Sequence, residues 1–170
     1  MMKVILVCGP TGAGKTTYSI KLAEALGAVR FSIDPWMQNL YSKDMKNLDY
    51  SWILERVERC YKQIWEVSEQ VLQSGGSVIW DLGFAEKSQR DLFVGLAKGI
   101  GAAPEIHYLD APVAQRKERV RMRNINKDPK LYSFEVSTFM FEFMEPKFEV
   151  PAENELQSGK KIETGQNVVA

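Results

Sequence analysis

Short apolar runs alternate with amphipathic segments along this chain. The runs are rich in β-branched and aromatic residues, and each stops at or near a glycine or an acid, as expected of buried parallel strands. They are "KVILVCG", "AVRFSID", "SVIWDLG" and "PEIHYLDA". Segments 16–26, 50–73 and 86–98 carry apolar residues at helical spacing between them. This alternation predicts an α/β fold with a doubly wound parallel sheet of about five strands.

The later part of the chain predicts two further helices and a polar end. A very basic helix is expected from Val113 to about Arg123, followed by the loop "NINKDPKLY". Ser133 is a plausible N-cap for a helix that reaches about Met144. We expect one domain over residues 1–150 and a polar tail over 151–170, in which "KKIET" fits a short final strand.

The stretch "VCGPTGAGKTT" carries the first sign of chemistry. From Gly9 to Thr16 it fits the phosphate-loop pattern G-x-x-x-x-G-K-[ST], between a predicted strand and a predicted helix. Its glycines let backbone N–H groups surround phosphate oxygens, and the helix N-terminus faces the same anion. Lys15 can neutralise the β- and γ-phosphates, and the Thr16 hydroxyl can bind Mg²⁺. The expected nucleotide-binding residues of this loop are Gly9, Pro10, Thr11, Gly12, Ala13, Gly14, Lys15, Thr16 and Thr17.

Three of the predicted strands end on an acid, at the sheet edge where ligands collect in such folds. Asp34 is a candidate base for an acceptor hydroxyl, or else a helix N-cap before Pro35. Asp81 is a candidate for holding Mg²⁺ through water, and an acceptor-side role or a capping role is the alternative. Asp110 is expected to be a strand-end cap.

The basic helix and its loop concentrate positive charge. "QRKERVRMRNINKDPK" holds seven basic and two acidic residues, a net charge of 7 − 2 = +5. Spacing places Arg116, Arg119 and Arg123 on one helical face. We expect this face to contact phosphate, with Arg119 and Arg123 in catalysis and Arg116 and Arg119 in nucleotide binding. A solvated charged face and a nucleic-acid contact are the alternatives.

The segment "YSFEVSTFMFEFMEPKF" mixes aromatics and methionines with glutamates. Packing into the core is one interpretation, and an apolar wall for an acceptor pocket is the other. The expected core-facing residues are Val136, Met140, Phe143 and Met144, while Phe134 and Phe141 point elsewhere.

The composition of the chain limits the kinds of partner that we expect it to bind. The chain has 170 residues, and its 22 lysines and arginines balance its 22 acids. Zero net charge argues against a protein that coats nucleic acid or membrane. No run approaches the roughly 18 to 20 apolar residues of a membrane span, and two cysteines are too few for a disulfide framework. We therefore expect a cytoplasmic protein without a membrane partner.

Four stretches together resemble a known group of proteins. "GPTGAGKTT", "FSIDPW", "VIWDLG" and "HYLDAPVAQRKERVRMRN" are similar to the P-loop kinases grouped with zeta toxins, chloramphenicol phosphotransferase and polynucleotide 5′-kinase, over roughly residues 3–145. The resemblance implies an adenylate-kinase-like fold, ATP with Mg²⁺, and a lid at about 116–132. It also implies that Asp34 activates the acceptor hydroxyl and that Arg116, Arg119 and Arg123 clamp the phosphates.

These patterns predict an ATP-dependent kinase acting on a hydroxyl of a small molecule or nucleotide-like acceptor. A polynucleotide 5′-hydroxyl kinase is one alternative, since it would use the same residues and the basic segment. A non-enzymatic ATP-binding or toxin-like regulatory module is another. The sequence identifies neither the acceptor nor the oligomeric state.

Overall fold

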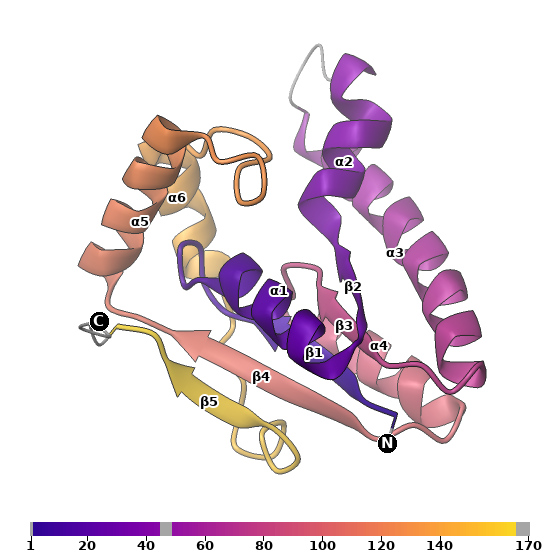
Figure 1. The fold of residues 1–170 in the computed structure, drawn as a ribbon. Helices are drawn as coiled ribbons and strands as arrows, with labels where there is room; N and C mark the ends of the chain where they lie inside the picture. Colours follow the sequence, from indigo (N-terminus) through magenta and orange to yellow (C-terminus); the bar gives the residue numbers. More distant parts are fainter. Residues whose placement is uncertain (1, 45–48, 166–170) are drawn as a thin grey trace.

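A five-stranded, all-parallel sheet organises the computed structural model, which describes residues 2–44 and 49–165 (Figure 1). The strand order is β2-β3-β1-β4-β5, and every neighbouring pair is parallel. This confirms the predicted α/β fold and its five strands. The strands are β1 (Val4–Cys8), β2 (Val29–Ser32), β3 (Val78–Asp81), β4 (Pro104–Asp110) and β5 (Lys160–Glu163).

Helices cover both faces of this sheet. They are α1 (Lys15–Leu26), α2 (Ile33–Tyr41), α3 (Tyr50–Gln73), α4 (Lys87–Gly99), α5 (Val113–Asn126) and α6 (Thr138–Met144), with 3₁₀ turns η1 (Ser42–Asp44) and η2 (Glu145–Lys147). None of the described helices is both long and apolar enough to cross a bilayer.

The central strand β1 shows why helices pack on both faces of the sheet. All five of its residues are buried. Val4, Leu6 and Cys8 join the larger core cluster beneath α2, α3 and α4, whereas Ile5 and Val7 face α1. Alternate side chains of a strand point to opposite faces, so an unbroken apolar run requires a layer of helices on each side.

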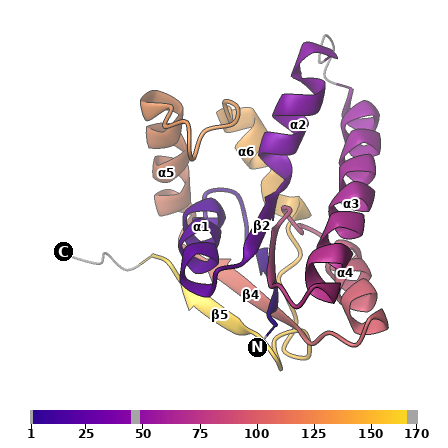
Figure 2. The ribbon, with the colours of Figure 1, turned by 45° about the vertical axis from the view of Figure 1, so that its right-hand side comes forward.

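The helices above the carboxyl edge of the sheet frame the site. Figure 2 shows α2 and α5 rising on the two sides of α1, with α6 behind and between them. The turn from β1 into α1 lies at the base of this frame, and β3 ends beside it.

The structure corrects the predicted border between β2 and α2. The strand ends at Ser32, and α2 begins at Ile33 instead of Pro35. Asp34 therefore lies in the first turn of the helix, and Ser32 occupies the N-cap position. Proline fits inside this turn because the first N–H groups of a helix have no intrahelical acceptor.

The aromatic helix also begins later than predicted. The side chain of Asn124 binds both backbone groups of Val136, donating to its carbonyl at 2.8 Å and accepting from its N–H at 3.2 Å. This pairing keeps the chain extended as far as Ser137, whose hydroxyl caps α6 by accepting from the Met140 N–H.

The later start changes the phase of α6. Phe141 is 2% exposed and packs with Val120 and Val136. Phe143 is 43% exposed. The assignment of Phe143 to the core and Phe141 to another surface was therefore wrong, whereas Val136 and Met140 do belong to the buried cluster.

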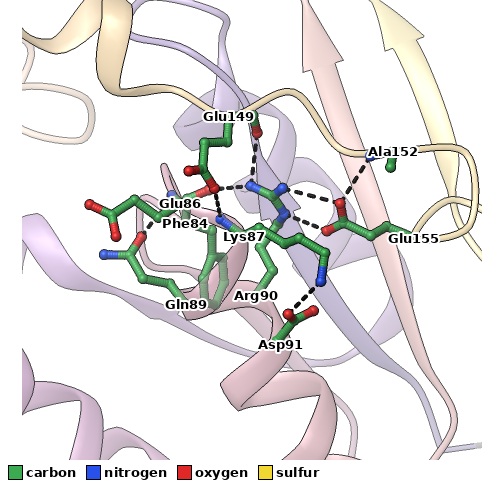
Figure 3. A network of polar contacts seen from close by, with 9 residues as sticks. All are labelled: Phe84, Glu86, Lys87, Gln89, Arg90, Asp91, Glu149, Ala152 and Glu155. Atoms are coloured by element: carbon green, nitrogen blue, oxygen red, sulfur yellow. Dashed lines mark hydrogen bonds and ion pairs between the residues drawn. The ribbon is translucent and has the colours of Figure 1, made fainter.

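Residues 151–165 of the expected polar tail attach to the rest of the fold at two places, and residues 166–170 of that tail lie outside the described part of the chain. β5 pairs with β4, which places the expected final strand at the edge of the sheet. Figure 3 shows a second attachment, centred on the buried Arg90 of α4. Its guanidinium pairs with Glu155 at 2.7 Å and donates to the carbonyls of Phe84 and Glu149.

Candidate active site

The phosphate loop joins β1 to α1 in the predicted strand–loop–helix arrangement. Gly12 and Gly14 have φ values of 79° and 95°, in the region that favours glycine. A Cβ at Gly12 would lie 2.6 Å from the carbonyl oxygen of Arg116, so a larger residue would push α5 away. The N-cap of α1 is Gly14, and no side chain caps this end. The first N–H groups of α1 thus remain available to an anion.

Lys15 lies at the start of α1 and points back over the loop. Its ammonium donates to the carbonyls of Gly9 at 2.7 Å and Pro10 at 3.1 Å. Burial lowers the pKa of Lys15, and the nearby carboxylates of Asp81 and Asp34 oppose this shift. The site thus holds a partly desolvated cation beside two acids.

Asp34 lines the same cleft as Lys15, from the first turn of α2. Burial raises the pKa of its carboxyl, and the charge of Asp81 raises it further, while Lys15 and Arg123 act in the opposite direction. A carboxylate with a raised pKa binds a proton more tightly, which suits a general base.

Asp81 is held by two residues that the sequence patterns did not single out. Its Oδ2 accepts from the Ser19 hydroxyl at 2.9 Å and from the Arg30 guanidinium at 2.6 Å. Arg30 also donates through Nε to the Ser19 oxygen at 2.7 Å. One feature of the sequence could have pointed to Arg30. It is an arginine inside the apolar strand run "VRFS", and a charge in such a strand needs a partner.

The oxygen ligands near the loop fit a Mg²⁺ ion whose other ligands are water and phosphate. The Thr16 hydroxyl and the Asp81 carboxylate both line the cleft. Within residues 2–44 and 49–165, no cluster of three or more His, Cys, Asp or Glu side chains is placed to hold a metal. Mg²⁺ seldom uses such an all-protein cage, and one or two protein oxygens are typical.

Arg119 and Arg123 of α5 both line the cleft. Arg119 lies over the loop, donating to the Thr164 hydroxyl at 3.0 Å and to the Thr164 carbonyl, and it approaches the Gly12 carbonyl at 3.4 Å. Arg123 differs, because its buried Nε has no hydrogen-bond partner in the described part of the chain. An unpaired guanidinium N–H at this position fits an anion that is supplied from outside the chain.

Arg116 does not line the cleft, although it shares a helix face with Arg119 and Arg123. Its guanidinium is buried against both carboxylate oxygens of Glu145 and donates to the carbonyls of Ala111 and Thr11. These contacts brace α5 against the loop and η2. Four of its five N–H groups are thus used inside the protein, and the residue does not line the cleft, so the phosphate contact expected of Arg116 gains no support from this geometry.

The cleft that these groups share has a volume of about 1160 Å³. The loop and α5 form one side of it, and apolar residues of the segment 131–148 form another. These residues include Phe134, Val136, Met140, Met144 and Phe148. The aromatic segment thus provides both a small core and one wall of the cleft. Asp110 lies outside the cleft and pairs with Lys161 at 2.9 Å.

The sequence and the fold were compared with those of known proteins. Residues 4–150 match the family model AAA_33, described as an AAA domain. No curated protein matches the sequence. The solved structures with the same fold include Kti12 from Chaetomium thermophilum in complex with ADP-AlF3, with a TM-score of 0.71 at 17% identity over 95% of this chain and 89% of that one.

Two further solved structures with a similar fold are a putative kinase and a gluconokinase. A putative kinase from Chloroflexus aurantiacus J-10-fl has a TM-score of 0.68 at 16% identity, over 97% of this chain and 90% of that one. A gluconokinase from Sinorhizobium meliloti 1021 has a TM-score of 0.60 at 19% identity, over 96% and 83%. At these identities the likeness concerns the fold. The family match shows that this chain belongs to the AAA_33 family of AAA domains, and its parallel α/β sheet is the fold that it shares with these solved structures.

Proposed function

We propose that this protein is an ATP-dependent kinase that phosphorylates a hydroxyl group of a small molecule. The observation that carries this proposal is the cleft that Asp34 and Lys15 share, because a candidate base and a candidate phosphate ligand line the same cavity. A protein that only binds nucleotide does not need a carboxylate on the acceptor side, whereas transfer to a hydroxyl does. The kinase-like fold of the relatives agrees with this assignment.

Each residue has a defined task in the proposed reaction. When bound, ATP supplies the γ-phosphoryl group, and its ADP portion leaves with the electron pair of the broken bond. The Asp34 carboxylate orients the acceptor hydroxyl and accepts its proton as the oxygen bonds to phosphorus. Lys15 and Arg123 stabilise the negative charge on the transferred group, because phosphoryl transfer depends on positioning and charge compensation.

Magnesium is the metal that we assign to the reaction. The Thr16 hydroxyl and the Asp81 carboxylate are the groups that would hold it, directly and through water respectively. Ser19 and Arg30 fix the Asp81 carboxylate in one orientation. The chain therefore orients this ligand without using Asp34, which stays available to the acceptor.

The charges of the basic segment favour a small acceptor over a polynucleotide. Three of its cations are paired with glutamates: Arg116 with Glu145, Lys117 with Glu142 and Arg121 with Glu118. Nucleic-acid backbones are bound by cations that replace condensed counterions. Cations that already have carboxylate partners contribute less to such binding, so we propose a small molecule as the acceptor.

Phosphorylation of a metabolite pool with γ-labelled ATP tests the proposal. We expect label to appear in a low-molecular-weight product with the intact protein and not with Lys15→Ala. Asp34→Asn should lower transfer about 100-fold or more while ATP binding persists, as for loss of a general base. Tight ATP binding without transfer to any acceptor would instead support the regulatory module, and labelled oligonucleotide ends would support the polynucleotide kinase.

A further inference from the structure

Outside the phosphate loop, one stretch of the cleft lining is apolar. We call this lining the acceptor wall. It consists of Ile33, Phe134, Val136, Met140, Met144 and Phe148. Figures 1 and 2 locate its two supports, α6 behind α5 and α2 on the opposite side. A contact between the Tyr50 and Phe143 rings, 5.8 Å apart, joins α3 to α6 and fixes their separation.

The cations of the cleft all lie on the side of the phosphate loop. Those among the described lining residues are Lys15, Lys21, Arg119 and Arg123, from α1 and α5. On the side of α6, Lys147 does not line the cleft, because its ammonium lies over the Phe143 ring at 4.6 Å and the Tyr50 ring at 5.2 Å. The acceptor wall therefore offers no cation to a negatively charged group.

Two of the four acids among the described lining residues add to this asymmetry, and the other two are Asp128 and Glu163. Asp34 and Asp81 both lie at the carboxyl edge of the sheet and line the cleft. Arg30 compensates the charge of Asp81, but no ion pair to Asp34 forms among the described residues. An acceptor with a phosphate or carboxylate near Asp34 would meet a like charge in a partly dehydrated site, and such pairs repel strongly.

We infer that the acceptor is an uncharged molecule that presents its hydroxyl from an apolar, ring-sized body. This inference rests on the proposed kinase function and names the substrate class. Methionine and phenylalanine side chains gain from covering apolar surface, at about 25 cal/mol per Å² removed from water, and methionine adapts to irregular shapes. Asp34 then meets a neutral hydroxyl, which is the only polar group that the acceptor has to present there.

A comparison of one uncharged acceptor with several anionic acceptors tests the inference. Phenyl β-glucoside provides a neutral ring alcohol with an apolar body, and glucose 6-phosphate, gluconate and a 5′-hydroxyl oligonucleotide provide anions. We expect kcat/KM for phenyl β-glucoside to exceed that for each anion by at least tenfold. Preference for any of the anions, or equal use, would overturn the inference while leaving the kinase proposal standing.

Absence of transfer to every probe would contradict the kinase proposal for these acceptors, and binding then decides the inference. The protein is loaded with a non-hydrolysable ATP analogue and titrated with the same probes by calorimetry. A Kd for phenyl β-glucoside at least tenfold below that of the anions supports the uncharged acceptor. Equal or tighter binding of an anion, or no binding of the glucoside, overturns it.

A charge placed in the acceptor wall gives a second test. Met144→Lys should lower kcat/KM or affinity for phenyl β-glucoside at least tenfold and should improve both for the anions, with ATP binding unchanged. Phe139→Lys is the matched control, because Phe139 belongs to the same helix but is 76% exposed and does not line the cleft. If both variants behave alike, the acceptor wall does not contact the acceptor.

Discussion

Arg30 on β2 holds the carboxylate of Asp81 on the neighbouring strand β3, with 2.6 Å between guanidinium Nη2 and Oδ2. The Ser19 hydroxyl completes the arrangement by donating to the same oxygen. Asp81 is 5% exposed, so its charge is compensated inside the protein. The orientation of this acid is therefore a property of the folded chain.

Removing the Arg30 charge should destabilise the fold. Arg30→Met leaves a buried carboxylate without its ion partner, and we expect a loss of about 3 kcal/mol in the free energy of unfolding. Arg30→Lys should lose less, because it keeps the charge but not the paired donors. Urea denaturation measures both, with the exposed Arg59→Met as control. A Met variant as stable as the wild type would show that Asp81 does not depend on Arg30.

The ionised Asp34 carboxylate should lower the free energy of unfolding at neutral pH, although the proposed reaction uses it as the base. Its raised pKa means that the folded state binds a proton more tightly than the unfolded state. Stability of the wild type therefore falls as the pH rises from the ordinary aspartate range through the raised pKa. Asparagine cannot ionise, so Asp34→Asn should be more stable than the wild type at pH 7, and this difference should vanish near pH 3.

Denaturation at several pH values measures this effect. Asp128→Asn, at an exposed acid that also lines the cleft, serves as the control for loss of a carboxylate elsewhere in the cleft. In the kinase assay, kcat/KM should rise with pH through the same raised pKa, since the base must be ionised. A pH-independent difference between Asp34→Asn and the wild type would contradict the assignment.

Arg123 should affect function without affecting stability. Its buried Nε lacks a hydrogen-bond partner in the part of the chain that the structure describes, so Arg123→Met removes no such bond at that atom. We expect transfer to fall about 100-fold, as for loss of one charge-stabilising donor. Arg121→Met, on the same helix but exposed and paired with Glu118, should retain activity. Equal activities of the two variants would exclude a role for Arg123.

The sequence predicted the fold and the loop well because their signals are local. Glycine, lysine and threonine at fixed spacing determine a phosphate loop, and buried parallel strands are unbroken apolar runs. The role of Arg30 was not predicted because its partner lies 51 residues away on another strand. The phase of α6 was wrong because Asn124, a residue of another helix, sets where that helix begins.

Arg90 should be a large contributor to stability. It is 1% exposed, pairs with Glu155, and donates to the carbonyl of Phe84, whose positive φ of 43° is unfavourable for a non-glycine residue. Arg90→Met should cost about 3–5 kcal/mol, because Glu155 would remain buried without its ion partner, with only the Ala152 N–H left to bind it.

A second variant separates charge from packing at this site. Adding Glu155→Met to Arg90→Met should restore part of the lost stability, because an apolar pair leaves no buried charge. Lys87→Met removes an exposed partner of Asp91 and should leave the unfolding midpoint unchanged. A double variant less stable than Arg90→Met would show that packing of the guanidinium dominates.

Thr164 should influence nucleotide binding from the end of β5. Its hydroxyl donates to the Ala13 carbonyl at 2.8 Å and accepts from Arg119 at 3.0 Å. The same hydroxyl also lies 3.1 Å from the Asp110 carbonyl. Thr164→Val keeps the shape of the side chain but removes all three contacts, which should cost about 1–3 kcal/mol. We expect ATP affinity to fall about tenfold by calorimetry, and the exposed Thr138→Val to change neither quantity. Unchanged affinity would mean that the loop is held without Thr164.

The contact between Thr164 and Ala13 also constrains when the site can form during synthesis. Residue 13 leaves the ribosome early, whereas its partner follows 151 residues later. A nascent chain that lacks β5 can form β1 and α1 but cannot fix the phosphate loop through this bond. A chain stalled before residue 164 should therefore bind nucleotide more weakly than a chain that includes β5, so ATP capture is expected to wait until β5 has joined the sheet.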